Sequence, residues 1–312
     1  MLTPPHDRSG LLSEQGVPTT LFLDSIDRWI ETMVADDRGG DDFMSRFVNA
    51  KVIAKGNGII CGHIIIERLV EKHASDCSIQ WMLEEGDEIM SQDTILEISG
   101  NSTEILKIER VLLNILGRLS GISTSTHDWV TITKNIGVAC TRKTDWGLLD
   151  KWAVHIGGGL THRLDREDAL MLKENDLATM KNKNESEIDA LKRMISDIDL
   201  EQNSEFTIIE VQNIEQAVVA ADTWFELQKA HARTDPVVLL LDNMMISQVI
   251  EIIIKLKELN LRKWCILEGS GGILKDSILD WDASGVDLVS TSAVNRGISP
   301  LDLSLIIDGE GK

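Results

Sequence analysis

The sequence predicts an α/β protein in which a smaller, β-containing domain precedes a parallel sheet curled into a barrel. Two observations support this fold. After about residue 128, apolar runs of strand length alternate with amphipathic helical segments, which is typical of a parallel sheet covered by helices on both faces. Polar or charged residues follow these runs, as expected where the carboxyl ends of barrel strands meet on one rim.

The region up to about His127 is predicted to form the smaller domain. A helix is expected over residues 21–34, followed by an acidic, glycine-rich turn over residues 36–42. Short β-rich runs come next, namely FVNAKVIAKGNGIICG, CSIQWML and TILEISG. From Thr103 onward apolar residues recur at helical spacing, so we expect a long helix to link the two domains.

The later region contains the apolar runs that predict the barrel. They are GVACT, WAVHIG, ALMLK, FTIIEV, VVLLLD, KWCILEG and VDLVST. Helices are predicted in SEIDALKRMISDI, NIEQAVVAADTWFELQKA and ISQVIEIIIKLKELN. About seven strands are too few for a complete eightfold barrel, and their spacing fits either an incomplete barrel or an open sheet. The polar residues at the strand ends favour the barrel.

The overall composition excludes several classes of function. With 31 Lys plus Arg against 51 Asp plus Glu, the net charge of −20 disfavours nucleic acid and membranes as partners. The four cysteines are scattered without a CxxC pair, and no signal peptide is apparent, so a cytoplasmic location with reduced thiols is expected. Neither a nucleophile elbow nor a Walker or Rossmann glycine motif is present, which disfavours hydrolases, NTPases and dinucleotide oxidoreductases.

Basic residues are concentrated beside the predicted strand ends of this acidic chain. They are Arg142, Lys143, His162, Arg163 and Lys173. Each one alone is well explained as a solvated surface charge. On one rim together they predict an anion pocket, because gathered like charges cost energy unless an anion compensates them. Arginine forks bind carboxylates and phosphates while lysine acts as a point charge, so the mixture suits a ligand that carries both groups.

Two further features at the strand ends fit a phosphorylated ligand. Asp242 ends a buried strand, where a carboxylate is costly without a partner, and either Mg²⁺ or a helix cap would satisfy it. Glu210 could serve likewise. Ser270, Gly271 and Gly272 open a predicted helix, whose backbone amides and dipole favour phosphate, although an ordinary turn explains the glycines equally well.

Several blocks in one order resemble the quinolinate phosphoribosyltransferases, also called nicotinate-nucleotide pyrophosphorylases. The blocks are IERVLLNILGRLSGIST, TRKTDWGLLDKWAVHIGGGLTHR, DALMLKEN, LLLDN, SGGI and ISPLDLSLII. The resemblance implies an incomplete seven-stranded α/β barrel over residues 128–296 and an N-terminal α/β sandwich over 1–127, to which 297–312 return. It also implies an Mg²⁺-dependent pentosyltransferase of NAD biosynthesis that joins quinolinate to phosphoribosyl pyrophosphate and acts as a homodimer or larger homo-oligomer.

The resemblance further implies roles for individual residues. Arg110 is expected to reach across the subunit interface into the partner's site, and Lys143, Lys173 and Asp242 are the expected catalytic residues. The expected substrate-binding residues are Arg110, Thr141, Arg142, Lys143, His162, Arg163, Lys173, Gln212, Asp242, Ser270, Gly271, Gly272 and Ser292. Asp242 and Asp176 are the expected magnesium ligands.

Departures from the family pattern affect the expected ligands. Gln212 stands where a second glutamate is usual, and Asp176 follows KEN where a histidine is usual, so we hypothesise that Asp176 restores the lost charge. Ser292 replaces a phosphate-binding glycine, and a shortened loop carries Trp146. These changes keep two alternatives open: a transferase for nicotinate or another aromatic acid, and a non-catalytic paralogue that binds sugar phosphates.

Overall fold

The computed structural model describes residues 3–37, 45–201 and 205–307. Contacts within the chain divide it into two compact units. The barrel unit comprises residues 3–8, 129–142 and 160–293, and the sheet unit comprises residues 9–128, 143–159 and those from 294 onward.

This division differs from the one predicted at residues 127/128 and 296/297 in two segments, besides boundary shifts that give residues 128 and 294–296 to the sheet unit. Residues 3–8 belong to the barrel unit, and residues 143–159 belong to the sheet unit. The second segment contains helix α4 (Leu148–Ile156), where the carbonyl of Ala153 accepts a 2.7 Å hydrogen bond from the Ser123 hydroxyl of helix α3 (Ser102–Ile132). This packing against α3 explains why the segment leaves the barrel.

The sheet unit is built on an antiparallel sheet in the order β14-β3-β7-β5. Its strands are β3 (Phe47–Ala54), β5 (Ser78–Trp81), β7 (Thr94–Asn101) and β14 (Leu303–Ile307), with shorter strands β1 (Ser13–Glu14), β2 (Val17–Pro18), β4 (Gly58–Ile59) and β6 (Glu88–Ile89). Its other helices are α1 (Thr20–Asp36) and α2 (His63–His73). The pairing of β14 with β3 brings the C-terminal segment back to this unit; the predicted turn over 38–42 and residues 308–312 lie outside the described residues.

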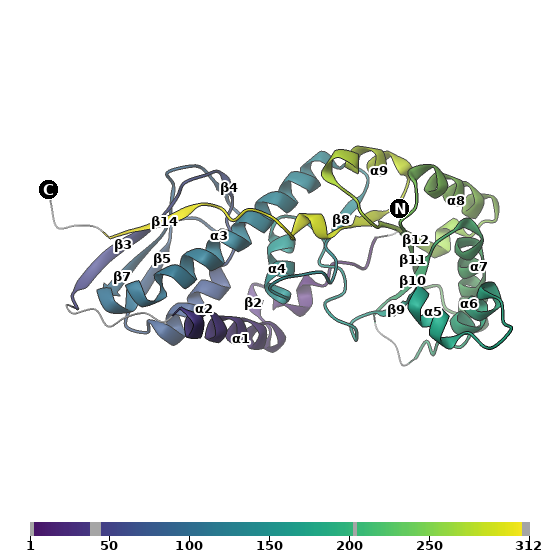
Figure 1. Ribbon diagram of the computed structural model, residues 1–312, viewed down its shortest axis with the longest axis horizontal. Helices are drawn as coiled ribbons and strands as arrows, with labels where there is room; N and C mark the ends of the chain where they lie inside the picture. Colours follow the sequence, from purple (N-terminus) through teal and green to yellow (C-terminus); the bar gives the residue numbers. More distant parts are fainter. Residues whose placement is uncertain (1–2, 38–44, 202–204, 308–312) are drawn as a thin grey trace. The chain divides into compact units, whose positions relative to one another are not determined.

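The barrel unit is built on a parallel sheet in the order β8-β13-β12-β11-β10-β9. Its strands are β8 (Gly137–Ala139), β9 (Leu170–Leu172), β10 (Thr207–Val211), β11 (Val237–Asp242), β12 (Cys265–Ser270) and β13 (Leu288–Ser290). The helices are α5 (Glu174–Met180), α6 (Glu187–Ser196), α7 (Ile214–Ala230), α8 (Ile246–Glu258) and α9 (Ile278–Ser284), of which α6, α7 and α8 lie outside the strands (Figure 1). The predicted α/β class with an incomplete barrel is confirmed.

One of the seven predicted strands is a helix in the structure. The run WAVHIG lies mostly in helix α4, so six parallel strands form this sheet in the described part of the chain. The helical spacing of Leu148, Leu149, Trp152 and Ile156 indicates this helix, but the run WAVHIG omits its first turn and therefore resembles a strand. Leu160, just after the glycine run, forms a parallel bridge with Ala139 and extends the sheet beyond β8.

An apolar cluster fills the interior of the barrel unit. Its buried members are Ala139, Ala169, Phe206, Ile208, Val238, Leu240, Ile266 and Leu288. Strand alternation puts these side chains on one face of the sheet. Among the helices of the described residues, none combines the length and the apolar character needed to cross a membrane.

Candidate active site

The inward face of the barrel strands changes from apolar to polar toward the carboxyl ends. In β12 the buried Ile266 is followed, two and four residues later, by Glu268 and Ser270. In β10 and β11 the same alternation leads from Ile208 to Glu210, and from Val238 through Leu240 to Asp242. These polar residues thus lie between the apolar core and the rim of the barrel, where barrel enzymes assemble their sites.

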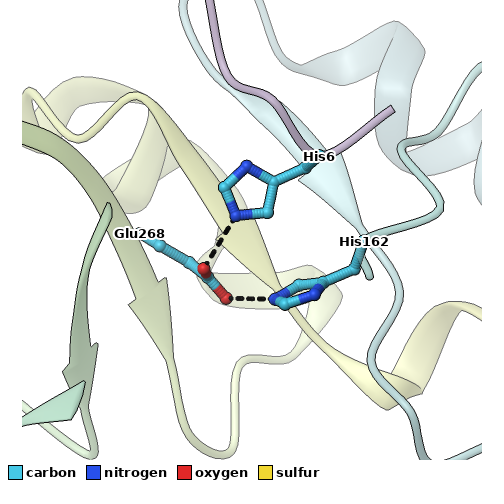
Figure 2. Close-up of side chains that lie close together, drawn as sticks. All are labelled: His6, His162 and Glu268. Carbon is cyan, nitrogen blue, oxygen red and sulfur yellow. Dashed lines mark hydrogen bonds and ion pairs between the residues drawn. The ribbon is translucent and has the colours of Figure 1, made fainter. Parts of the chain in front are cut away.

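Glu268 is the centre of a buried hydrogen-bond network (Figure 2). Its carboxylate is fully buried and accepts from His162 Nε2 at 3.1 Å, from His6 Nε2 at 3.0 Å and from the Ser290 hydroxyl. Burial alone would raise the pKa of this carboxyl, but the interactions with His162 and His6 outweigh it and hold the pKa well below its usual range. Glu268 is therefore an ionised group inside the barrel.

His162 is held by hydrogen bonds at both ring nitrogens. Its Nδ1 accepts a 2.7 Å hydrogen bond from the Arg163 backbone N–H, and its Nε2 lies 3.1 Å from the Glu268 carboxylate. His162 is among the basic residues of the anion pocket that the sequence predicts. The structure places it in the left-handed region (φ 54°), with both ring nitrogens bonded inside the protein.

Arg163 carries a guanidinium group into the protein interior. The residue is 6% exposed, and its Nη1 donates to the carbonyl of Ala169 at 3.0 Å. Burial and the neighbouring charges of Arg142 and Arg166 lower the pKa of Arg163, and the negative charge of Glu268 partly offsets this. A buried cation beside two like charges is the arrangement that an incoming anion stabilises.

Carboxylates lie at the carboxyl ends of β10 and β11. Burial raises the pKa of Glu210, Lys173 opposes this, and the negative charge of Asp242 adds to the rise. A cavity of about 230 Å³ lies against this edge, with Lys173, Glu174, Glu210 and Gln212 in its lining. We call this edge, with Glu210 and Asp242, the anionic side of the rim, and the region of Arg142 and Arg163 the cationic side.

Gln212 and Asp176 have protein partners on the anionic side. Gln212 Nε2 donates to Glu174 Oε2 at 2.7 Å, a contact that a glutamate at this position could not make. Asp176 Oδ2 accepts from the Lys173 backbone N–H at 2.9 Å and thereby caps helix α5. The cap accounts for Asp176 without a metal, and its predicted metal role stays a prediction.

Replacing Asp176 by asparagine separates these two roles. The amide oxygen of asparagine can still accept from the Lys173 N–H, whereas the charge is lost. We expect Asp176→Asn to keep the stability of the wild type, and Asp176→Ala to lower the free energy of unfolding by about 1 kcal/mol. An increased magnesium requirement in Asp176→Asn would show that the carboxylate serves the metal.

The predicted phosphate loop follows β12. Gly271 has φ +98°, and a Cβ there would lie 2.4 Å from Asn243 Oδ1 and 2.7 Å from the Asn243 nitrogen. The Asn243 N–H also donates to the Ser270 carbonyl at 2.9 Å, which ties the end of β11 to this loop. Gly271 is thus required by its surroundings, whereas Gly272, at φ +62°, has open space on its Cβ side.

Alanine substitutions at these two glycines form a matched pair. Both positions have positive φ, so each alanine carries a backbone cost of about 1 kcal/mol. Only Gly271→Ala adds a clash with the backbone of Asn243, and we expect it to lower the melting temperature and raise the KM for phosphoribosyl pyrophosphate clearly more than Gly272→Ala. Equal effects of the two variants would remove the special role of Gly271.

The other predicted site residues fall into both units. Thr141, Arg142 and Ser292 lie in the barrel unit, at or after the carboxyl ends of β8 and β13. Arg110 and Lys143 belong to the sheet unit, where the Lys143 carbonyl accepts from Asn295 Nδ2 at 3.0 Å. Arg110 is exposed on α3 and lines a cavity of about 410 Å³ within that unit.

The comparisons with known proteins decide the family. The model of the quinolinate phosphoribosyl transferase C-terminal domain matches residues 122–306, and that of the N-terminal domain matches residues 40–120. The chain belongs to the quinolinate phosphoribosyltransferase family. The resemblance that the sequence blocks indicated is therefore confirmed.

Individual relatives of this phosphoribosyltransferase family match over most of their length. A probable nicotinate-nucleotide pyrophosphorylase (carboxylating) from Methanothermobacter thermautotrophicus is 30% identical over 293 residues, which cover 90% of this chain and 98% of the relative. One from Methanocaldococcus jannaschii is 34% identical over 265 residues, covering 81% and 84%. The solved structure of nicotinate-nucleotide pyrophosphorylase from Francisella tularensis gives a TM-score of 0.76 at 25% identity, covering 91% of this chain and 96% of that one.

Three residues of the buried network were not identified from the sequence of this phosphoribosyltransferase. Glu268 was detectable, because it is a charged residue inside an apolar strand, two positions before the predicted phosphate-binding Ser270 and on the same face. Ser290 lies in the predicted run VDLVST, and its local sequence does not indicate a buried partner. His6 gave no signal, because nothing in its sequence neighbourhood indicates that residues 3–8 enter the barrel unit.

Proposed function

We propose that the protein is a decarboxylating quinolinate phosphoribosyltransferase. It forms nicotinate mononucleotide, CO₂ and pyrophosphate from quinolinate and phosphoribosyl pyrophosphate. The observation that carries the proposal is the buried Arg163 guanidinium beside Arg142 and Arg166, which faces an excess of positive charge unless an anion binds. The names of the relatives and the match over both domains support the same activity.

The pyridine dicarboxylate is proposed to bind on the cationic side. An arginine fork pairs with a carboxylate through two parallel hydrogen bonds, and burial strengthens such a contact. Arg163 is buried and Arg142 is exposed, so Arg163 suits the carboxylate of the flat ring and Arg142 suits a more solvated group. A diacid uses this concentration of cations more fully than a monoacid would.

The anionic side fits a divalent cation. Glu210 and Asp242 end neighbouring parallel strands, and each would gain from a cation between them, because Asp242 raises the pKa of Glu210. Carboxylate oxygens together with phosphate oxygens are the ligands that Mg²⁺ prefers. We propose that these two carboxylates hold Mg²⁺, which when bound would neutralise charge on the pyrophosphate.

The proposed reaction has two steps. The lone pair of the pyridine nitrogen forms a bond to C1 of the ribose, while the bond from C1 to the pyrophosphate oxygen breaks and pyrophosphate leaves with that electron pair. The bond from ring C2 to its carboxylate then breaks, CO₂ leaves, and the electron pair on C2 takes up a proton. Arg163 positions the diacid, and Lys143 and Lys173 are proposed to balance charge on the leaving pyrophosphate.

The direct test is turnover with both substrates. Purified protein with quinolinate, phosphoribosyl pyrophosphate and Mg²⁺ is expected to release pyrophosphate and CO₂ in equal amounts and to yield nicotinate mononucleotide by mass spectrometry. Turnover with nicotinate and not with quinolinate would replace the proposed substrate. Binding of the sugar phosphate without any release of pyrophosphate would identify a non-catalytic paralogue.

The paralogue remains a second candidate because of one contact. Gln212 replaces the usual second glutamate and is bonded to Glu174, so the rim has one acidic group fewer than the family pattern implies. The pair Glu210 and Asp242 is nevertheless retained. This retained pair favours the enzyme.

We also propose that the active form is a homodimer or larger, in which Arg110 serves the neighbouring subunit. The support is that Arg110 is exposed on α3 and lines a cavity of the sheet unit together with Trp146 and Asp302. A cytoplasmic location is proposed on the scattered cysteines, which lack any disulfide spacing. One plant relative is named as chloroplastic, so cell fractionation is the appropriate test of the proposed location.

Mixing two inactive variants tests the shared site. Arg110→Ala and Lys173→Ala homo-oligomers are each expected to have little activity. When subunits are exchanged, one site of a mixed dimer lacks both side chains and the other keeps both, so activity should reappear at roughly a quarter of the wild-type level in a statistical mixture. Failure to regain activity despite proven subunit exchange would place Arg110 in its own subunit's site.

A further inference from the structure

The N-terminal residues 3–8 lie against the loop that carries His162 and Arg163. The Arg8 backbone N–H donates to the Thr161 hydroxyl oxygen at 2.7 Å, and that hydroxyl donates to the His6 carbonyl at 3.2 Å. The Arg8 side chain pairs with Asp168 at 2.9 Å, and the other oxygen of Asp168 accepts from the Leu164 N–H at 2.9 Å. The N-terminal segment is therefore tied to both ends of this loop.

The His6 side chain reaches the centre of the barrel unit. It is fully buried, and its ring meets the His162 ring edge-on at 4.9 Å between centroids (Figure 2). The centroid of the Phe206 ring lies 5.3 Å away. Because Glu268 is an ionised acceptor, the His6 Nε2 must donate to it. Its Nδ1 is buried and has no hydrogen-bond partner among the described residues, so a proton there would be unsatisfied.

A metal ion is the alternative explanation for this cluster. The ligand atoms of His6, His162 and Glu268 all lie within 4.8 Å of one another, which is close enough for one ion. A metal on His162 Nε2 would leave the ring proton on Nδ1, directed at the Arg163 backbone N–H that now donates to this atom. The two N–H groups would then face each other at 2.7 Å between nitrogens, so the backbone favours hydrogen bonding over a metal.

We propose that His6 is a positioning residue that fixes the anion-binding arginine of this enzyme through Glu268 and His162. His6 holds one oxygen of Glu268, and the other oxygen then orients His162. The His162 Nδ1 in turn receives the Arg163 N–H, so the ring sets the backbone at the residue that carries the guanidinium. The role in substrate binding rests on the proposed transferase function, whereas the effect on the His162 ring does not.

The expected effect of losing His6 follows from the position of its Nε2 donor beside Glu268. Without His6 a buried carboxylate oxygen loses its partner and Glu268 can turn away from His162. Arg163 would then be less well placed before the substrate arrives, so quinolinate binding should suffer more than turnover of the saturated enzyme. We expect a rise of about 10-fold or more in the KM for quinolinate, because leaving a buried ionised acceptor unsatisfied has an effect of that size.

Glutamine and asparagine at position 6 give a matched pair. The glutamine amide can place its nitrogen close to the position of His Nε2, whereas the shorter asparagine cannot reach Glu268. We expect His6→Asn to raise the KM for quinolinate with little change in kcat or in the KM for phosphoribosyl pyrophosphate, and His6→Gln to restore the wild-type value. His231→Asn, on the far end of helix α7, is the control for histidine loss as such.

Nitrogen-15 NMR of the histidine rings gives a readout that needs no turnover. The His162 ring signals are expected to be alike in the wild type and in His6→Gln, and to change in His6→Asn. Unchanged His162 signals and unchanged KM in a folded His6→Asn would overturn the proposal. Stoichiometric zinc binding that His6→Asn abolishes would overturn it in favour of a metal site. An inactive wild type with the expected ring signals would contradict only the transferase function.

Discussion

Replacing Arg163 by alanine is expected to lower kcat/KM for quinolinate by about 100- to 1,000-fold, since a desolvated charged contact to the substrate is lost. Arg163→Lys should recover little of this, because an ammonium group keeps the charge but cannot present a planar fork to a carboxylate. Steady-state kinetics with each substrate varied in turn is the measurement. The loss should appear with quinolinate, and the KM for phosphoribosyl pyrophosphate should change less.

The fold should survive this substitution, which makes the kinetic result interpretable. Burial and the like charges of Arg142 and Arg166 disfavour the charged form of Arg163, so its removal relieves an unfavourable electrostatic term in the free protein. We therefore expect a melting temperature close to that of the wild type. Arg233→Ala, at an exposed ion pair with Asp235, serves as the control for loss of an arginine. Near-normal rates in Arg163→Ala would refute the assignment of this residue.

Glu268→Gln is expected to lower the free energy of unfolding by about 3 kcal/mol, because three donors converge on a buried carboxylate. The glutamine amide would direct two N–H donors at groups that already donate. Denaturant unfolding measures the change. The exposed Glu251 of α8 provides the control, since Glu251→Gln removes the same charge without a buried network.

The same carboxylate makes stability depend on pH in one direction. The pKa of Glu268 is held below its ordinary value of 4.5 in the folded protein, so its contribution is present above that value and is lost as the pH falls toward the lower folded pKa. Between pH 6 and about pH 3 the wild type should therefore lose more stability than Glu268→Gln. Parallel pH profiles of the two proteins would contradict an ionised Glu268.

The sequence predicted the elements whose pattern is local. The long apolar runs became β10, β11 and β12, and the helical period from Thr103 became α3. Helix α2 was missed although Ile65, Ile66, Leu69 and Val70 recur at helical spacing. Its cap could not be predicted from local sequence, because Glu85, more than twenty residues away, accepts from the backbone N–H groups of Gly62 and His63.

In the candidate site, too, local features could be predicted and tertiary contacts could not. Strand ends could be read from the chain, so the rim positions of Lys173, Asp242 and Ser270 were predictable. The hydrogen-bond partners of His162 were not predictable, because they are the next backbone N–H and a carboxylate that lies 106 residues away in sequence. Tertiary hydrogen bonds, which no spacing rule encodes, decide which polar residues carry charge.

The account depends on the barrel rim accepting a doubly negative ring, and calorimetric titration tests this most directly. Quinolinate, nicotinate and picolinate, which share a pyridine ring and differ in carboxylates, are titrated into the wild type and Arg163→Ala. We expect quinolinate to bind at least about 10-fold more tightly than either monoacid, and Arg163→Ala to abolish the difference. Equal affinity of the wild type for all three ligands would contradict the account.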